Sequence, residues 1–389
     1  MENNINKFCW MNLFDGLQFS LPIFTIFLLG CGMNFTQIGL IVGASYMIAF
    51  ILDIPLSALA DKHSRKSFLI LSNACFMILN VIFFFSDSFE MFFVGYCFNG
   101  LGTAFTSGIA SAFVYDTLLS LGKEKQYDKA QSRILKYRFA GKIIASLAGV
   151  YLYHINPRLP FLLQALASLV CVLLSFQFKE PAWEKSISAS SRQIKEGFSF
   201  LFNHKVIWNT VIVFSVVDSI FDILSNYYQP VMELSDIPVV YFGAIYLSVN
   251  IIGLLGAILY PRMSKAIDWK NMMLLYLSIN FMSSIFFGAH IAGLVILSIA
   301  LLTFSSSSFD IYIGNIIHQI VPSSHRATAL SIRSQIFNLF FFIIMYAVGY
   351  SVDHGSILIG MMINVFLVFM AFLAFLKVSY RKSAILQME

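Results

Sequence analysis

The sequence predicts an all-α polytopic membrane protein with twelve transmembrane helices in two six-helix bundles, and three observations carry this prediction. The chain of 389 residues is 58% hydrophobic and only 12% charged, whereas a soluble protein has about a quarter of its residues charged. Apolar runs of about 18 or more residues recur along its whole length, which is the signal of membrane-spanning helices. Its basic residues gather at alternate connections between these runs.

The apolar runs give the expected spans in order. We place them near residues 8–30, 35–60, 67–86, 91–119, 137–156, 159–178, 206–229, 239–261, 271–290, 293–317, 328–352 and 355–378. The segment before the first run has one lysine, Lys7, and no small-residue cleavage site, so we interpret that run as a retained helix rather than a signal peptide. Gly141, Ala145 and Gly149 stand at i, i+4, i+8 in the fifth span and predict a close helix contact.

The distribution of Lys and Arg predicts the orientation. Only Arg158 lies in an odd-numbered loop, and these loops carry acids such as Asp87 and Glu233 instead. Cytoplasmic segments are enriched in Lys and Arg, so we expect both termini in the cytoplasm and the chain in a bacterial-type inner membrane. The same bias explains the net charge of +5 without a nucleic-acid partner.

The longest polar stretch, residues 179–205, divides the chain. It ends in a piece near 194–202 that mixes Lys195 and Glu196 with Phe and Leu side chains, and we expect this piece to lie along the membrane surface. The expected domains are an N-terminal bundle at 1–178, a cytoplasmic linker at 179–205, a C-terminal bundle at 206–379 and a cytoplasmic tail at 380–389. Two bundles joined by a linker suggest rocking about a site at the bilayer midplane.

Sequence motifs for catalysis or metal binding are absent. The chain contains no G-x-x-x-x-G-K-[ST], G-x-S-x-G or H-E-x-x-H pattern. Its five cysteines form no close pair, so we expect reduced packing residues. We therefore expect no enzyme activity, no cofactor and no metal site, and we expect a monomer.

Four predicted helices carry a polar stripe at helical spacing. The stripes are Asn12-Asp15-Gln18, Asn99-Thr103-Thr106, Asp218-Asp222-Asn226 and Thr303-Ser307-Asp310. A carboxylate near the bilayer midplane costs roughly 2.5–3.5 kcal/mol on insertion scales, so helices that accept it commonly line a water-filled path. The stripes predict a transport path whose substrate-binding candidates are Asp15, Gln18, Asn99, Thr103, Asp222, Asn226, Tyr228 and Asp310.

Asp218 and Asp222 stand at i, i+4, and we expect no basic residue at their depth. A low dielectric and a neighbouring carboxylate both favour the protonated acid, so this pair is a candidate for coupling transport to protons. The alternative is two hydrated acids lining a vestibule. Asp15 and Asp310 also lack expected cationic partners and join the proton-coupling candidates. An acidic cavity with an aromatic rim suits an amphipathic cation; the expected rim is Phe14, Phe19, Tyr227, Tyr228, Phe309 and Tyr312.

Asp116 lies near the same end of its span as Arg138 and Lys142 do in the next span. We expect an ion pair among these residues, with a structural role and gating as the alternative.

Residues 53–66 hold the most specific local signal. Leu59-Ala60-Asp61-Lys62 and Arg65-Lys66 resemble the loop signature of the major facilitator superfamily, G-x-L-A-D-[RK]-x-G-R-[KR], with Ser57 and Ser64 in place of its two glycines. His325 to Ser331 is similar to a second stretch common in these transporters. The resemblance extends over essentially the whole chain and implies that Asp61 and Arg65 hold the cytoplasmic side closed. A carboxylate inside a basic run is not required by topology, which favours such a latch.

The resemblance also places spans one, four, seven and ten around the central cavity, and spans two and eleven side by side. Asp53 and Arg333 are therefore a gate candidate. Two antiporter patterns of the family are incomplete. Tyr96 stands where an arginine would precede Gly100, and residues 140–145 lack the proline of the fifth-span motif.

We predict a proton-coupled secondary transporter that exports cationic or zwitterionic amphipathic molecules by alternating access. The alternative is a proton-driven symporter that imports a small polar nutrient or a metal chelate with the same acids. A third class is a non-transporting membrane receptor or a membrane enzyme.

Overall fold

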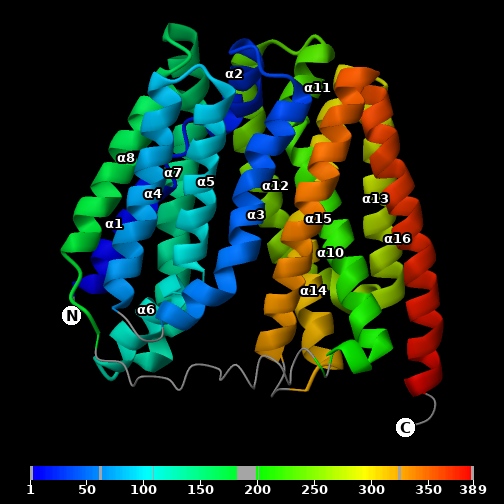
Figure 1. The fold of residues 1–389 in the computed structure, drawn as a ribbon. Helices are drawn as coiled ribbons and strands as arrows, with labels where there is room; N and C mark the ends of the chain where they lie inside the picture. Colours follow the sequence, from blue (N-terminus) through cyan, green and yellow to red (C-terminus); the bar gives the residue numbers. More distant parts are fainter. Residues whose placement is uncertain are drawn as a thin grey trace. The chain divides into compact units, whose positions relative to one another are not determined.

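The computed structural model describes residues 3–60, 64–107, 109–181, 199, 201–322 and 326–386. Every element in this part of the chain is helical (Figure 1), which confirms the predicted all-α class. The latch candidate Asp61 and most of the expected linker, including most of the surface piece near 194–202, lie outside the described residues.

The first half of the chain runs through eight α-helices or helical segments and two short 3-10 turns. Their bounds are α1 (Asn4–Asp15), η1 (Leu21–Ile23), α2 (Phe24–Gly30), α3 (Phe35–Ala60), α4 (Arg65–Phe85), α5 (Phe89–Thr106), α6 (Ile109–Leu119), η2 (Glu124–Gln126), α7 (Tyr127–Ile155) and α8 (Leu159–Phe176).

The second half follows the expected spans more directly. Its elements are α10 (Lys205–Asn226), α11 (Tyr228–Leu234), η3 (Val239–Tyr241), α12 (Phe242–Ala266), α13 (Trp269–Gly288), α14 (Ala292–Ile320), α15 (Arg326–His354) and α16 (Ile357–Leu386).

Nine segments of the described chain are long and apolar enough to cross a membrane. They correspond to every expected span except the first, fourth and fifth. The fifth is present as α7, whose first half is strongly charged. The first and fourth were expected as single helices, and this expectation is wrong because both are broken.

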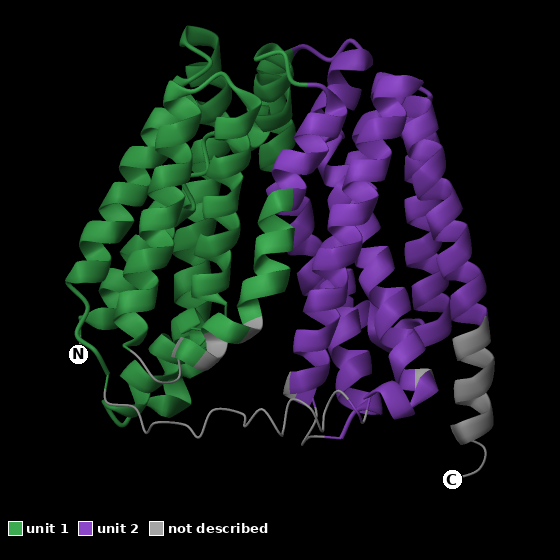
Figure 2. Cartoon of the chain, in the orientation of Figure 1, with its two compact units in different colours: residues 1–33, 44–190, 239–247 green, residues 34–43, 191–238, 248–389 purple. Residues whose placement is uncertain are grey.

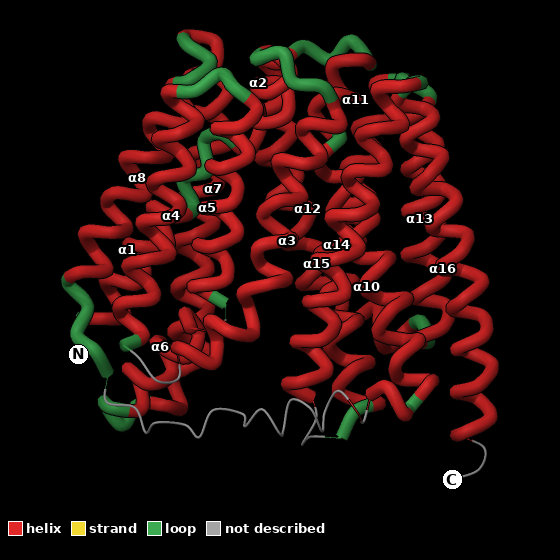
Figure 3. Tube along the Cα trace, in the orientation of Figure 1, coloured by secondary structure: helices red, strands yellow, loops and turns green. Residues whose placement is uncertain are grey.

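The first span breaks between Asp15 and Leu21, part-way along the helices of its unit rather than at their ends (Figure 3). Pro22 is the second residue of the 3-10 turn that follows. Proline has no N–H and its ring excludes the carbonyl four residues earlier, so a continuous helix cannot pass through it unperturbed. Outside the helical ladder, the Ser20 amide donates to Gln164 Oε1 of α8 at 3.1 Å, and the Ser20 hydroxyl donates to the same oxygen at 2.8 Å.

The fourth span breaks after Thr106. The hydroxyls of Thr103 and Thr106 donate to the carbonyls of Asn99 and Gly102, at 2.9 and 3.1 Å. The Ser72 hydroxyl of α4 also donates to the Gly102 carbonyl, at 2.8 Å. Such hydroxyl donation to the preceding turn competes with the helical ladder and bends helices.

The chain divides into two compact units (Figure 2). Unit 1 comprises residues 1–33, 44–190 and 239–247, and unit 2 comprises 34–43, 191–238 and 248–389. The expected domain limits stay a prediction.

Unit 1 packs α4 against α5 and α8, and α1 against α7. A Cβ on Gly141 would lie 2.2 Å from the Leu13 carbonyl oxygen, and one on Gly149 would lie 2.1 Å from the Phe19 carbonyl oxygen. These glycines allow the backbones of α7 and the first span to touch, which confirms the predicted close contact.

Unit 2 packs α10 against α15, and α13 against α14 and α16. Its aromatic centre is Phe309 of α14, whose ring centroid lies 5.1 Å from that of Tyr276 and 5.5 Å from that of Phe221. All three rings are buried.

Candidate transport site

Arg333 of α15 lies between two carboxylates of unit 2. Its guanidinium forms an ion pair with Asp218 of α10, and its Nη2 lies 3.6 Å from Asp310 Oδ1 of α14. The side chains of Arg333 and Asp218 are 18% and 16% exposed, whereas that of Asp310 is 67% exposed. The triad therefore has a buried ion pair on one side and an accessible carboxylate on the other.

Small hydroxyl side chains of α10 bring it close to α15. Ser215 donates to the Arg333 carbonyl at 3.2 Å, and Ser219 donates to the Phe337 carbonyl at 3.3 Å. Asp218 lies between these two serines in the sequence, so the same helix contact positions its carboxylate for Arg333.

The expectation that Asp218 and Asp310 have no cationic partner is wrong. Arg333 was expected to pair with Asp53. Instead, α15 packs against α10, and the Arg333 guanidinium contacts Asp218. Asp53 itself lies half-buried in α3, and its role as a gate residue stays a prediction.

The next polar side chains of α10 hydrogen-bond to the backbone of their own helix. Asn226 Nδ2 and the Ser225 hydroxyl donate to the Asp222 carbonyl, at 2.8 and 2.7 Å. The Asp222 carboxylate lies one turn beyond Asp218.

The rings expected to rim an open cavity are mostly buried. Tyr227, Tyr228, Phe309, Tyr312 and Phe19 all belong to the core. Tyr228, for example, packs edge-on against Phe287 with centroids 5.9 Å apart. The aromatic argument for a lipophilic cation loses its support, because these side chains hold helices together.

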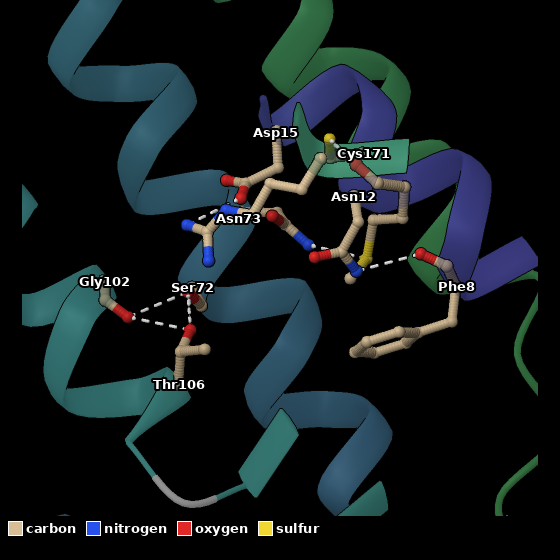
Figure 4. Close-up of polar contacts among 10 residues, drawn as sticks. Phe8, Asn12, Asp15, Ser72, Asn73, Gly102, Thr106 and Cys171 are labelled. Carbon is tan, nitrogen blue, oxygen red and sulfur yellow. Dashed lines mark hydrogen bonds and ion pairs between the residues drawn. The ribbon is translucent and has the colours of Figure 1, made fainter. Parts of the chain in front are cut away.

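Unit 1 has its own ion pair at the break in the first span. Asp15 ends α1, and its Oδ2 lies 3.1 Å from Arg138 Nη2 of α7 (Figure 4). The expectation of an unpartnered Asp15 is therefore wrong. Gly16 makes the approach possible, since a Cβ there would lie 2.3 Å from the Arg138 carbonyl oxygen. Lys142 follows one turn later on α7, and Gln18 lies in the break itself.

Buried polar contacts tie α1 to α4 and α8 beside this pair (Figure 4). Asn73 Nδ2 of α4 donates to the Met11 thioether of α1 at 3.5 Å, and Cys171 Sγ of α8 donates to the Met11 carbonyl at 3.4 Å. Asn12 donates to the Phe8 carbonyl of its own helix, at 2.9 Å. These contacts hold the helix that ends at Asp15.

Asp116 pairs with Arg65 of α4 and not, as expected, with Arg138 or Lys142. The reason is that α6 packs against α4, and both side chains are mostly buried there. Glu180 after α8 completes this cluster by accepting from the backbone amides of Arg65 and Lys66, at 2.8 and 3.0 Å.

Sequence reasoning missed Glu180 and Gln164. Glu180 follows α8 in the chain and reaches the start of α4 only through the tertiary fold, so no local pattern marks it. A glutamine inside an apolar span, such as Gln164, is a signal of a buried hydrogen-bond partner.

Arginine–carboxylate pairs on apolar helices are typical of membrane proteins that move a solute or an ion. Residues 8–290 match the family model of the Major Facilitator Superfamily, so the chain belongs to this superfamily. The chain is 26% identical over 330 residues to the "Uncharacterized MFS-type transporter YxaM" of Bacillus subtilis (strain 168), covering 80% of each chain.

Solved structures share the fold. The nucleoside transporter NupG superposes with a TM-score of 0.83 at 15% identity, over 98% of this chain and 99% of that chain. A bacterial homolog of the human lysosomal transporter Spinster gives a TM-score of 0.74 at 13% identity, over 97% of each chain. The predicted fold class is thereby confirmed, and the protein is a multi-pass membrane transporter. The family matches point to transport rather than catalysis.

Proposed function

We propose that this transporter couples proton movement to the passage of a small polar solute at the Asp218–Arg333–Asp310 triad. The observation that carries the proposal is the difference in exposure between the two carboxylates of one arginine, 67% for Asp310 against 16% for Asp218. One guanidinium balances one carboxylate. The second negative charge therefore stays on the accessible Asp310.

Asp310 can exchange its charge in two ways. It can take a proton, or it can accept hydrogen bonds from a solute. Protonation weakens its attraction to Arg333 and leaves the buried Asp218–Arg333 pair intact, since that pair needs no further charge. Proton binding and solute binding then involve the same carboxylate, that of Asp310, so each affects the other. Such an interaction is what couples the two fluxes.

The charge balance favours a polar or zwitterionic solute over a lipophilic cation. Asp15, Asp218 and Asp310 all have an arginine beside them, so none of these three carboxylates forms a purely acidic site. A solute with both donors and acceptors can satisfy Asp310 and Arg333 together. One structural relative is named a nucleoside transporter, and nucleosides are polar solutes of this kind. This reasoning favours the symport alternative over export of amphipathic cations.

The orientation belongs to the same proposal. The positive-inside pattern supports cytoplasmic termini in a bacterial inner membrane. All three residues of the triad come from one chain, which supports a monomer.

The test is flux in proteoliposomes with an imposed proton gradient. Labelled nucleosides and dipeptides represent polar solutes, and tetraphenylphosphonium represents lipophilic cations. We expect a polar solute to accumulate with inward proton flow. Asp310→Asn should abolish accumulation while retaining exchange at equal concentrations. Asp268→Asn, which changes an acid at the start of α13, is the control and should behave as wild type. Gradient-driven expulsion of tetraphenylphosphonium would establish the export function instead.

A further inference from the structure

One exposed stripe of α7 changes from cationic to apolar along the helix. Lys129, Arg133 and Lys136 occupy it at i, i+4 and i+7, and all three are exposed. At 3.6 residues per turn the stripe continues, within an arc of roughly 100°, through later positions. Those positions carry exposed apolar side chains, namely Ile143, Ile144, Leu147 and Tyr151.

An aromatic pair marks the cationic end of this stripe. Trp10 of α1 is 50% exposed, and its ring meets Tyr137 edge-on, with centroids 5.4 Å apart and an interplanar angle of 83°. The Arg133 guanidinium carbon lies 5.9 Å from the centroid of the same Tyr137 ring. Exposed Trp and Tyr side chains gather at the membrane–water interface, so Arg133 lies at headgroup level, steadied by a cation–π contact.

Within the described part of the chain, none of Lys129, Arg133 and Lys136 forms an ion pair, whereas Arg138 just beyond them pairs with Asp15. The positive-inside rule accounts for basic residues near this end of α7. It does not account for their alignment with the exposed apolar stripe or for the aromatic contact.

We propose that this stripe binds one anionic phospholipid, with the phosphate at Arg133 and Lys136 and an acyl chain along Ile143 to Tyr151. The rise from Lys136 to Tyr151 is about 22 Å at 1.5 Å per residue, which exceeds the ~15 Å of one leaflet's hydrocarbon. The apolar side chains from Ile143 to Tyr151 line about 12 Å of this rise, so most of the length of an acyl chain has apolar partners. Juxtamembrane Lys and Arg each contribute about 1 kcal/mol of attraction to an anionic membrane surface.

The experiment uses the full-length protein in nanodiscs of phosphatidylcholine with increasing phosphatidylglycerol. We expect phosphatidylglycerol to raise the unfolding temperature of the wild type by several degrees. The double variant Arg133→Gln/Lys136→Gln should match wild type in pure phosphatidylcholine and lose most of the shift. Lys123→Gln/Lys125→Gln removes the same charge from the neighbouring exposed segment and should keep it. Equal losses in both double variants would mean general surface charge and overturn the proposal.

A second measurement reads the site directly. Brominated phosphatidylglycerol should quench tryptophan fluorescence more than brominated phosphatidylcholine does, and Trp10→Phe should remove that difference. Glycerol phosphate tests the headgroup alone. If it reproduces the thermal shift without a lipid tail, the stripe binds free phosphate esters and the lipid assignment is wrong. Equal quenching by both brominated lipids would also overturn it.

Discussion

Arg333 is the residue on which the C-terminal ion-pair triad depends. It lies 115 residues from Asp218 in the chain, and its guanidinium meets one buried and one exposed carboxylate. Removing one partner of a buried pair leaves an uncompensated charge and costs about 3–5 kcal/mol, whereas removing both charges is often nearly neutral.

Arg333→Gln should therefore destabilise the protein by about 3–5 kcal/mol, and adding Asp218→Asn should recover part of that loss. The measurement is the unfolding temperature in detergent for wild type, both single variants and the double variant, treated as a cycle. A double variant less stable than Arg333→Gln would show that the two residues are not coupled in this way.

Cys31, which follows α2, tests local electrostatics outside the spans. Burial and the nearby Asp87 carboxylate raise the pKa of its thiol, while Arg158 opposes them. A raised pKa means less thiolate at a given pH, and the thiolate is the reactive form. Asp87→Asn should lower this pKa and speed maleimide labelling of Cys31 several-fold near neutral pH.

The control for that measurement is a pH series. The rates of the variant and the wild type should converge at high pH, where both thiols are ionised. A constant ratio at all pH values would indicate altered access rather than altered charge.

At the scale of elements, the break between α1 and η1 depends on a side chain from another helix. Gln164 Oε1 accepts from both the amide and the hydroxyl of Ser20. Leaving a buried donor unsatisfied costs about 1–3 kcal/mol. Gln164→Leu should lower the unfolding temperature accordingly, and Gln164→Glu, which keeps an acceptor, should lower it less. Equal effects of the two substitutions would mean that packing, not hydrogen bonding, holds the break.

The start of α3 is capped from α15. Asp353 accepts from the amides of Phe35 and Thr36, at 2.9 and 2.7 Å, so its charge stabilises the positive end of α3. Loss of a side-chain cap costs about 0.5–2 kcal/mol. Asp353→Ala should show this loss in thermal unfolding.

Asp268→Ala is the matched comparison for Asp353. Asp268 stands at the N-cap of α13 but makes no capping hydrogen bond through its side chain. Its removal should change stability little. Similar losses for the two alanine variants would contradict the assigned role of Asp353.

At the scale of the whole molecule, the topology can be checked with single cysteines. On the proposed orientation, Cys31 follows the first span on the extracytoplasmic side, and Lys123 lies in a cytoplasmic loop. A membrane-impermeant maleimide should label Cys31 in intact cells. Lys123→Cys, in a chain without Cys31, should react only after the membrane is permeabilised. The reverse pattern would invert the topology.

Much of the fold could be predicted from sequence because the signals are local. Hydropathy marked every long span, and the motif around Asp61 to Lys66 led to the superfamily. The breaks at Ser20 and Thr106 were missed. They depend on Gln164 and Ser72 of other helices, which no window around the break contains.

The sequence by itself determined the all-α membrane class, the order of the spans and the family, because length, composition and periodicity are properties of contiguous residues. Only the tertiary structure decided which arginine pairs with which acid: Arg333 with Asp218 and Asp310, Arg138 with Asp15, and Arg65 with Asp116. A buried charge takes the partner that helix packing brings within a few ångströms, and that packing joins residues far apart in the chain.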